Sequence, residues 1–367
     1  MAHHPPSTAD ALGNPVHVQG AASLALLDDF VMGFLSCEAR AARLVLEPTG
    51  DDSPLVQAYG ATLHLFAESR EAAANARPFI ERAQAGARRA TPRERRYIAA
   101  VAAWAAGDMP HAIALHEEQA REFPRDLVSV KLGQYHCFNL GDGPGMLRLA
   151  LAAQPHAADV PYLHGMLAFG YEQCHLMREA EASALHAIAM RRKEPWAHHA
   201  LAHVMLTEGR LAEGLAFMEA MSETWTGLNS FMLTHNWWHL ALFLIDLGRG
   251  DEALAVYDHR CWDVEPGYSQ DQIGAVSLLA RLELAGIDVG GRWQAVAGRM
   301  AGRTRDHVLP FLDLQYLYGL ARAGRPEADT LLANIEAFAP KAPEAGRPAW
   351  QRVCVPAARG LLAHARG

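Results

Sequence analysis

The sequence predicts an all-α protein, a right-handed α-solenoid of stacked tetratricopeptide-like helical hairpins. The first observation is a near repetition between residues 162 and 257, where three stretches each open on aromatic residues and close on small ones. Aligning the turns at His175, Gly209 and Gly248 gives spacings of 34 and 39 residues. A period near 34 with this pattern is typical of the tetratricopeptide repeat. The second observation is that strand-type alternation is almost absent.

Other stretches place apolar residues at helical spacing, and turn-forming residues such as Gly and Pro separate these stretches. The best start signal is Thr91, which can cap a helix whose first positions hold Pro92 and Glu94. Residues 339–348 are rich in Pro, Ala and Gly and are predicted to form a loop. Beyond the repeats, helices are expected over 21–46, 55–68, 72–87, 93–106, 111–122, 127–140, 145–153, 267–286, 292–300, 308–324, 327–338 and 353–366.

The expected domain organisation is simple. Residues 1–20 are polar and contain Pro, which predicts a flexible leader. Residues 21–367 are expected to form a single superhelical domain, with the clearest repeats in 162–257. Hairpins in such an array contact only their neighbours and offer a concave surface for binding.

Composition excludes several classes of function. The net charge of −8 and a pI near 6.2 argue against a nucleic-acid partner, which usually meets a basic face. No apolar run approaches the ~20 residues needed to cross a bilayer, so no membrane association is expected. Five widely spaced cysteines without a CxxC pair fit neither a disulfide framework nor a zinc knuckle. We therefore expect a cytoplasmic protein.

Several blocks resemble the tetratricopeptide repeat protein 38 family, a bacterial and eukaryotic group of divergent superhelical proteins. The most specific block is HNWWHLAL at 235–242. Gly274 stands where the family usually carries Asp, and of its Asn-Asp-x-His run only Asp313 is present. The family's usual C-terminal segment is also expected to be missing after Gly367. The resemblance implies a superhelical fold and protein binding. Its supporting blocks lie at 165–172, 196–204, 209–214, 281–284 and 292–293.

The nineteen histidines are unevenly distributed. Equivalent positions of stacked repeats lie side by side, so three rows of rings and imidazoles should run along the solenoid axis. The rows are Tyr162–Trp196–His235, His164–His198–Trp237 and Gly165–His199–Trp238.

Two HxxxH pairs raise the question of a metal. His199/His203 and His235/His239 each place two rings on one helix face, and together could supply four nitrogens to zinc. Against this, His239 aligns with Ala200, and neither pair contains the carboxylate of an HExxH motif. Buried, hydrogen-bonded histidines are the favoured interpretation, and no metal or cofactor is predicted.

An enzyme is one alternative. His203 or His235 could act as general acid or base at neutral pH, with Glu172 or Asp313 as the carboxylate partner. The reaction would be of hydrolase or lyase type, inside the superhelix. No nucleophile elbow and no recognisable Cys/His arrangement is present. The competing interpretation is that Glu172 caps or braces a repeat turn.

The leading prediction is a scaffold that holds a peptide or small molecule in a His/Trp-lined concave groove. Flat amphipathic side chains give large contact area at low entropy cost, although the same rings could simply pack between hairpins. The groove interpretation predicts accessible rings that are not bonded to one another. The predicted ligand-binding residues are Tyr162, His164, Trp196, His198, His199, Asn236, Trp237, Trp238 and His239.

A third alternative is a homo-oligomeric assembly protein. It predicts exposed apolar residues near the C-terminus, at Val353, Val355 and Leu361, because the end of a solenoid needs a polar cap or a neighbour.

Overall fold

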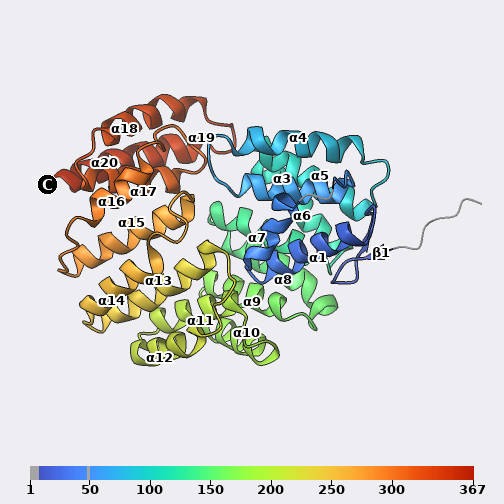
Figure 1. Ribbon diagram of the computed structural model, residues 1–367, viewed down its shortest axis with the longest axis horizontal. Coiled ribbons are helices and arrows are strands. Elements are labelled where there is room, and N and C mark those ends of the chain that lie inside the picture. Colours follow the sequence, from blue (N-terminus) through green and yellow to red (C-terminus); the bar gives the residue numbers. More distant parts are fainter. Residues whose placement is uncertain (1–7, 48–49) are drawn as a thin grey trace, which may run out of the picture. The chain divides into compact units, whose positions relative to one another are not determined.

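The computed structural model describes residues 8–47 and 50–367, and nearly all of its regular structure is helical (Figure 1). The all-α prediction is confirmed. None of the helices in the described ranges is long and apolar enough to span a bilayer. The helices are α1 (Ala21–Leu35), α2 (Arg43–Leu46), α3 (Pro54–Leu65), α4 (Ala72–Ala85), α5 (Pro92–Ala105), α6 (Met109–Glu122), α7 (Leu127–Asn139), α8 (Gly143–Ala157), α9 (Pro161–Gln173), α10 (Met177–Met190), α11 (Pro195–Thr207), α12 (Leu211–Ser222), α13 (Ser230–Asp246), α14 (Gly250–Val256), α15 (Ser269–Leu284), α16 (Arg292–Met300), α17 (Pro310–Arg322), α18 (Glu327–Phe338), α19 (Arg347–Ala349) and α20 (Val355–Arg366).

Short elements complete the chain. Strands β1 (Thr8–Ala9) and β2 (Pro15–Val16) pair antiparallel. Two 3₁₀ turns lie at Ala39–Ala42 and Ala339–Lys341, and two π-helical turns at Tyr257–Cys261 and Trp350–Cys354. The predicted loop at 339–348 therefore contains a 3₁₀ turn and the start of α19.

The chain forms two compact units. Unit 1 comprises the described residues up to Phe66 together with Ala73–Arg210 and Ala220–Asn229. Unit 2 comprises Ala67–Ala72, Leu211–Glu219 and Ser230–Gly367. The prediction of a single superhelical domain stays a prediction.

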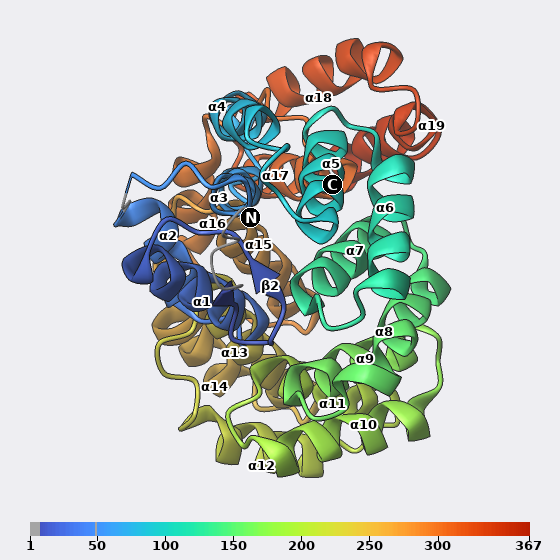
Figure 2. The same ribbon diagram turned by 90° about the vertical axis from the view of Figure 1, so that its right-hand side faces the viewer.

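In unit 1, the helices from α5 to α11 form successive hairpins, each contacting the next along the chain (Figure 2). The first helix of a hairpin is the more buried one. Every residue of α9 from Tyr162 to Gly170 is buried, whereas α10 buries only Ala180, Ala184 and Ala187. This spacing of three and four residues puts the alanines on one face, where a small side chain lets the helices approach closely.

In unit 2, the helices from α13 to α18 follow the same plan. α13 contacts α14 and α15, α15 contacts α16 and α17, and α17 contacts α18 and α20 (Figure 1). Each unit is therefore a stack of helical hairpins, as expected of an α-solenoid.

The repeat alignment is visible in the backbone of the turns. His175, Gly209 and Gly248, which the sequence aligned, all adopt positive φ, at 57°, 70° and 73°. Glycine reaches this left-handed region without steric cost and is the usual residue after a helix end. His175 makes the same turn with a side chain present.

Helix starts also follow the sequence signals. At Thr91, both halves of the predicted capping box with Glu94 are formed. Asp108, Asp126 and Asp142 each accept a hydrogen bond from a backbone N–H in the first turn of the next helix. Such caps satisfy donors that a helix leaves unpaired at its start.

Part of the predicted leader at 1–20 is held by contacts with later residues of the chain. Met1–Ser7 lie outside the described residues. From Thr8 on, the strand pair is held by buried Asp10, which lies 3.8 Å from the Arg93 guanidinium. Arg125 donates to the Leu12 carbonyl at 3.0 Å.

The helix predicted over 21–46 is wrong in its middle. α1 ends at Leu35 because Cys37 adopts a φ of 56°, which no helix interior allows. The carbonyl of Cys37 then accepts from Asn229 N at 2.8 Å, and Ala39 N donates to the Gly227 carbonyl at 3.0 Å. Long-range pairing with residues 227–229 thus replaces the helical bonds.

Candidate functional site

The predicted site residues fall on four helices of two units. In unit 1, α9 carries Tyr162, His164 and Glu172, and α11 carries Trp196, His198, His199 and His203. In unit 2, α13 carries His235, Asn236, Trp237, Trp238 and His239, and α17 carries Asp313.

Two predicted ligand-binding histidines have a structural role. His164 Nε2 donates to the Ala158 carbonyl and His198 Nε2 donates to the Arg192 carbonyl, both at 2.9 Å and both six residues back. Trp225 Nε1 donates to His198 Nδ1 at 3.1 Å. Burial lowers the pKa of His198 to about 4, so its ring is neutral. These two rings secure the turn before the first helix of each hairpin.

His199 and His203 point at each other. Their Nε2 atoms lie 2.9 Å apart, and the ring planes are inclined by 73°. His199 is buried and His203 is half-buried. This is the four-residue helical spacing, which stacks two side chains on one face.

A carboxylate holds the second ring of this pair. Glu172 Oε1 lies 3.3 Å from His203 Nδ1, joining the first helices of two successive hairpins. Burial raises the pKa of Glu172, but hydrogen bonds from His203 and Gln173 outweigh it and leave the pKa below its ordinary value. Glu172 is therefore a carboxylate that can fix the orientation of the His203 imidazole.

Aromatic rings extend from this pair across three first helices. Phe138 on α7 lies 5.6 Å from Phe169 on α9, and Phe169 lies 5.0 Å from Trp196 on α11. We call Phe138, Phe169 and Trp196 the aromatic row. Its inner end reaches His199, 4.9 Å from Trp196, and its outer end is Phe138, which is 46% exposed. Tyr162, by contrast, is buried and lies beneath the Arg191 guanidinium.

A lysine that sequence reasoning missed lies beside the row. Lys131 Nζ is 5.2 Å from the Trp196 ring and donates to the carbonyls of Phe34 and Leu35 at 2.9 Å. Its Nζ also lies 3.1 Å from Cys37 Sγ. No sequence signal connects these residues, because the long-range pairing of residues 37–39 brings them together.

Glu194 was also missed. It is fully buried at the start of α11, where it accepts a hydrogen bond from Ala197 N. Burial raises its pKa to about 7, and the Ala197 bond and the charge of Lys131 oppose that rise. The Glu-Pro pair at 194–195 is a helix-start signal that could have revealed the cap, although not its burial.

Unit 2 repeats the imidazole geometry. His235 and His239 place their Nε2 atoms 3.2 Å apart, with ring planes inclined by 85°. His235 stacks between Phe231, at 5.2 Å, and Trp238, at 5.5 Å.

The other predicted residues of α13 differ in environment. Asn236 is buried, while Trp237 and Trp238 are half-buried. Arg260 lies 4.9 Å from the Trp237 ring and Arg281 lies 4.9 Å from the Trp238 ring, in cation–π contact.

Asp313 has a partner that the sequence did not suggest. It is buried, and its Oδ2 lies 2.6 Å from His307 Nδ1 rather than beside His235. Burial raises the pKa of Asp313, and His307 opposes the rise. His307 lies in the loop before α17 with a φ of 48°, six residues before Asp313.

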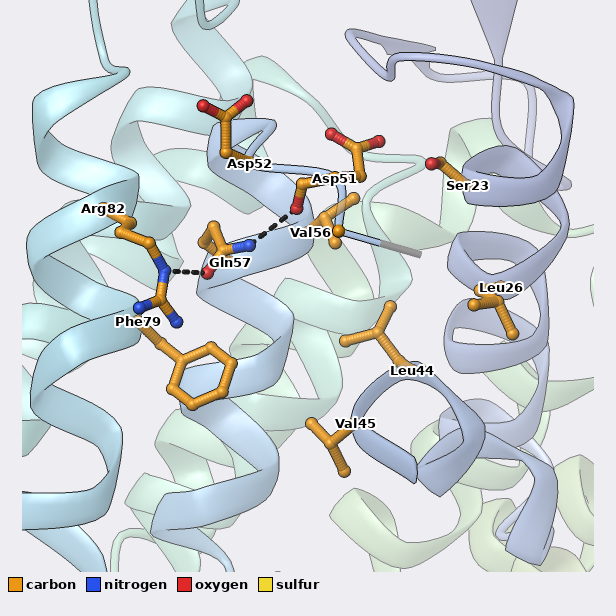
Figure 3. Close-up of a pocket in the computed structure, with 11 residues that line it drawn as sticks. Ser23, Leu26, Leu44, Val45, Asp51, Asp52, Val56, Gln57, Phe79 and Arg82 are labelled. Atoms are coloured by element: carbon orange, nitrogen blue, oxygen red, sulfur yellow. Dashed lines mark hydrogen bonds between the residues drawn. The ribbon is translucent and has the colours of Figure 1, made fainter. Parts of the chain in front are cut away.

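A cavity of about 320 Å³ in unit 1 lies elsewhere. Its walls come from α1 to α4, where Arg82 donates to Gln57 and Gln57 donates to the Asp51 carbonyl, each at 2.7 Å (Figure 3). The predicted site residues do not line it. Its lining residues are Ser23, Leu26, Leu44, Val45, Gly50, Asp51, Asp52, Val56, Gln57, Phe79 and Arg82.

In the described part of the chain, His199 and His203 of unit 1, and His235 and His239 of unit 2, are histidines that could supply ligands to a metal ion. We call His199/His203 and His235/His239 the two histidine pairs. Each pair lies within one unit.

Fold and site together define a tetratricopeptide-like helical-repeat scaffold with aromatic and imidazole groups on its first helices. No family model matches the sequence. A chain in the structure of Naa15/Naa10 bound to HypK-THB is similar over 94% of this chain, at 14% identity and a TM-score of 0.30. This protein spans 55% of the length of that chain. The likeness is too distant to transfer a partner or an activity.

Proposed function

We propose that the protein is a binding scaffold of the tetratricopeptide repeat protein 38 type, and that the aromatic row of unit 1 holds a peptide or small molecule through a planar group. The observation that carries the proposal is the continuous series of ring contacts from exposed Phe138 through Phe169 to Trp196. The helix α9 packs against α11, and α7 is joined to α9 by a hydrogen bond of 3.1 Å from Gln134 to the Met166 carbonyl, so the positions of these rings are fixed before a ligand arrives.

The chemistry of the row suits such a ligand. Planar aromatic groups prefer offset or edge-to-face contacts with rings, each contributing about 0.5–1.5 kcal/mol beyond area burial. The Lys131 ammonium at one side and the Glu172 carboxylate near His203 supply opposite charges that can orient a polar end. A few polar groups at the edge of an apolar surface are typical of small-molecule sites.

The histidines have a smaller part in this proposal than the sequence predicted. The groove interpretation required imidazoles that are not bonded to one another, yet His199 and His203 face each other at 2.9 Å. His164 and His198 are bonded to backbone carbonyls. We therefore assign ligand contact to Phe138 and Trp196.

The test is a ligand-observed NMR screen of planar small molecules and short aromatic peptides. Compounds that bind the wild type should lose binding in Phe138→Ala. They should retain it in Leu185→Ala, which removes a side chain of similar exposure (50%) from α10, a second helix. The proposal is refuted if the compounds bind Phe138→Ala as well as they bind Leu185→Ala and the wild type.

The alternatives stay predictions. The Glu172–His203 contact is the geometry that an acid–base enzyme would need. For an assembly protein, Val353 is 61% exposed, as that alternative expects, while Val355 and Leu361 are half-buried.

A further inference from the structure

We propose that each of the two histidine pairs binds a divalent transition metal ion of the zinc class through its Nε2 atoms. The proposal is independent of the aromatic-row ligand, and either can fail without the other.

The distance within each pair matches metal ligation. Metal–nitrogen bonds of about 2.0–2.1 Å place two adjacent imidazole nitrogens on one ion roughly 2.9–3.4 Å apart. The structure gives 2.9 Å for His199/His203 and 3.2 Å for His235/His239. In both pairs the same atom, Nε2, faces the same atom of the partner.

The carboxylate of Glu172 fixes the tautomer in unit 1. His203 Nδ1 donates a hydrogen bond to Glu172 Oε1 across 3.3 Å. The Nε2 atom of His203 then offers a lone pair toward His199. In protein zinc sites, a histidine ligand usually donates its other ring N–H to a carboxylate. That carboxylate orients the imidazole ring and raises its basicity.

Ring neighbours orient the imidazoles further. Phe169 and Trp196 contact His199 at 5.1 and 4.9 Å. Phe231 and Trp238 stack on the two sides of His235. Such walls limit the rotation of the imidazoles, so little side-chain entropy is left to lose on binding.

The ligand type selects the ion. Neutral imidazole suits zinc, copper, nickel and iron, whereas magnesium and calcium require oxygen ligands. Neither pair contains the carboxylate of an HExxH motif, but that carboxylate is a catalytic base rather than a ligand, so its absence does not bear on binding.

The experiment is zinc titration of chelator-treated protein against a chromophoric zinc indicator. All proteins carry His3→Gln and His4→Gln, which removes the imidazoles nearest the N-terminus. We expect the background protein to bind zinc, and each double variant, His199→Gln/His203→Gln or His235→Gln/His239→Gln, to lose the share of zinc that its pair binds. A double variant that binds less zinc than the background protein supports ligation by that pair. The control His111→Gln/His156→Gln removes two exposed imidazoles on other helices and should bind as the background does.

Glu172→Gln gives a graded readout. Loss of an outer carboxylate typically lowers metal affinity by about 10–100-fold without abolishing it. A Glu172 that merely braces the turn would change the melting temperature and leave the zinc affinity unchanged.

A second measurement requires no histidine substitution. In ¹⁵N spectra of the imidazoles, zinc should shift the Nε2 signals of the two pairs and leave those of His164 and His198 unchanged. The proposal is overturned if zinc moves none of the four signals, or if both double variants fold and bind zinc as the background protein does.

Discussion

Glu194 shows how a single carboxyl group makes stability depend on pH. Burial raises its pKa from about 4.5 to about 7, so the folded protein holds this proton more tightly than the unfolded chain. The group therefore stabilises the fold least at high pH, and stability is lost as pH rises between those two values. Glu194→Gln keeps an oxygen for Ala197 N and does not titrate. The unfolding free energy of the variant minus that of the wild type should therefore increase by up to roughly 3 kcal/mol as the pH rises from 4 to 8. Urea unfolding at several pH values measures this, and a constant difference would contradict it.

The buried ion pair at Arg93 predicts a large loss. The Arg93 guanidinium lies 3.0 Å from Asp126, and both side chains are buried. Arg93→Ala leaves that carboxylate without its cation and should cost about 3–5 kcal/mol. Arg148→Ala is the control, because it breaks a 3.0 Å contact with Glu117 at an exposed arginine and should cost under about 1 kcal/mol. Urea denaturation compares the two, and similar losses would show that burial does not decide the effect.

At the scale of elements, two helical glycines of unit 2 should respond in opposite directions. A Cβ on Gly214 of α12 would lie 2.2 Å from the Phe243 ring, which is fully buried on α13. Gly214→Ala should therefore destabilise by about 1–3 kcal/mol. Gly274 on α15 has open space around it, so Gly274→Ala should stabilise by up to about 1 kcal/mol. Melting temperatures of the two variants give the result, and a shift in the same direction for both would refute the packing argument.

Much of the element plan was predictable, because it depends on local signals. The turns at His175, Gly209 and Gly248 share one backbone conformation, and the helices 292–300 and 327–338 begin and end where the pattern placed them. The break at Cys37 was not predictable. Its hydrogen bonds go to residues 227–229, and no local rule reports such a distant partner.

The site was predictable in its residue types and less so in its contacts. Four-residue spacing was enough to place His199 against His203. The pairing of Glu172 with His203 was expected only as a carboxylate near some histidine, since the match depends on how two hairpins stack. Asp313 pairs with His307, which lies in the loop before α17 with a φ of 48°, and helical periodicity carries no information about that loop.

At the scale of the whole molecule, the two units are interleaved along the sequence. Leu211–Glu219 belongs to unit 2, although the residues directly before and after it belong to unit 1. In that segment, Gly214 is the residue against which Phe243 packs. A fragment of residues 230–367 should therefore be less helical and melt at a lower temperature than a fragment of 211–367. Circular dichroism tests this, and identical melting curves would show that the segment adds nothing to unit 2.

The most direct test of the proposed function is a crystal structure of the protein with a compound from the NMR screen. We expect ligand density against Phe138 and Trp196, with a planar group packed on the rings of the aromatic row. Density in the cavity beside Gln57 and Arg82 instead, with the aromatic row bare, would contradict it.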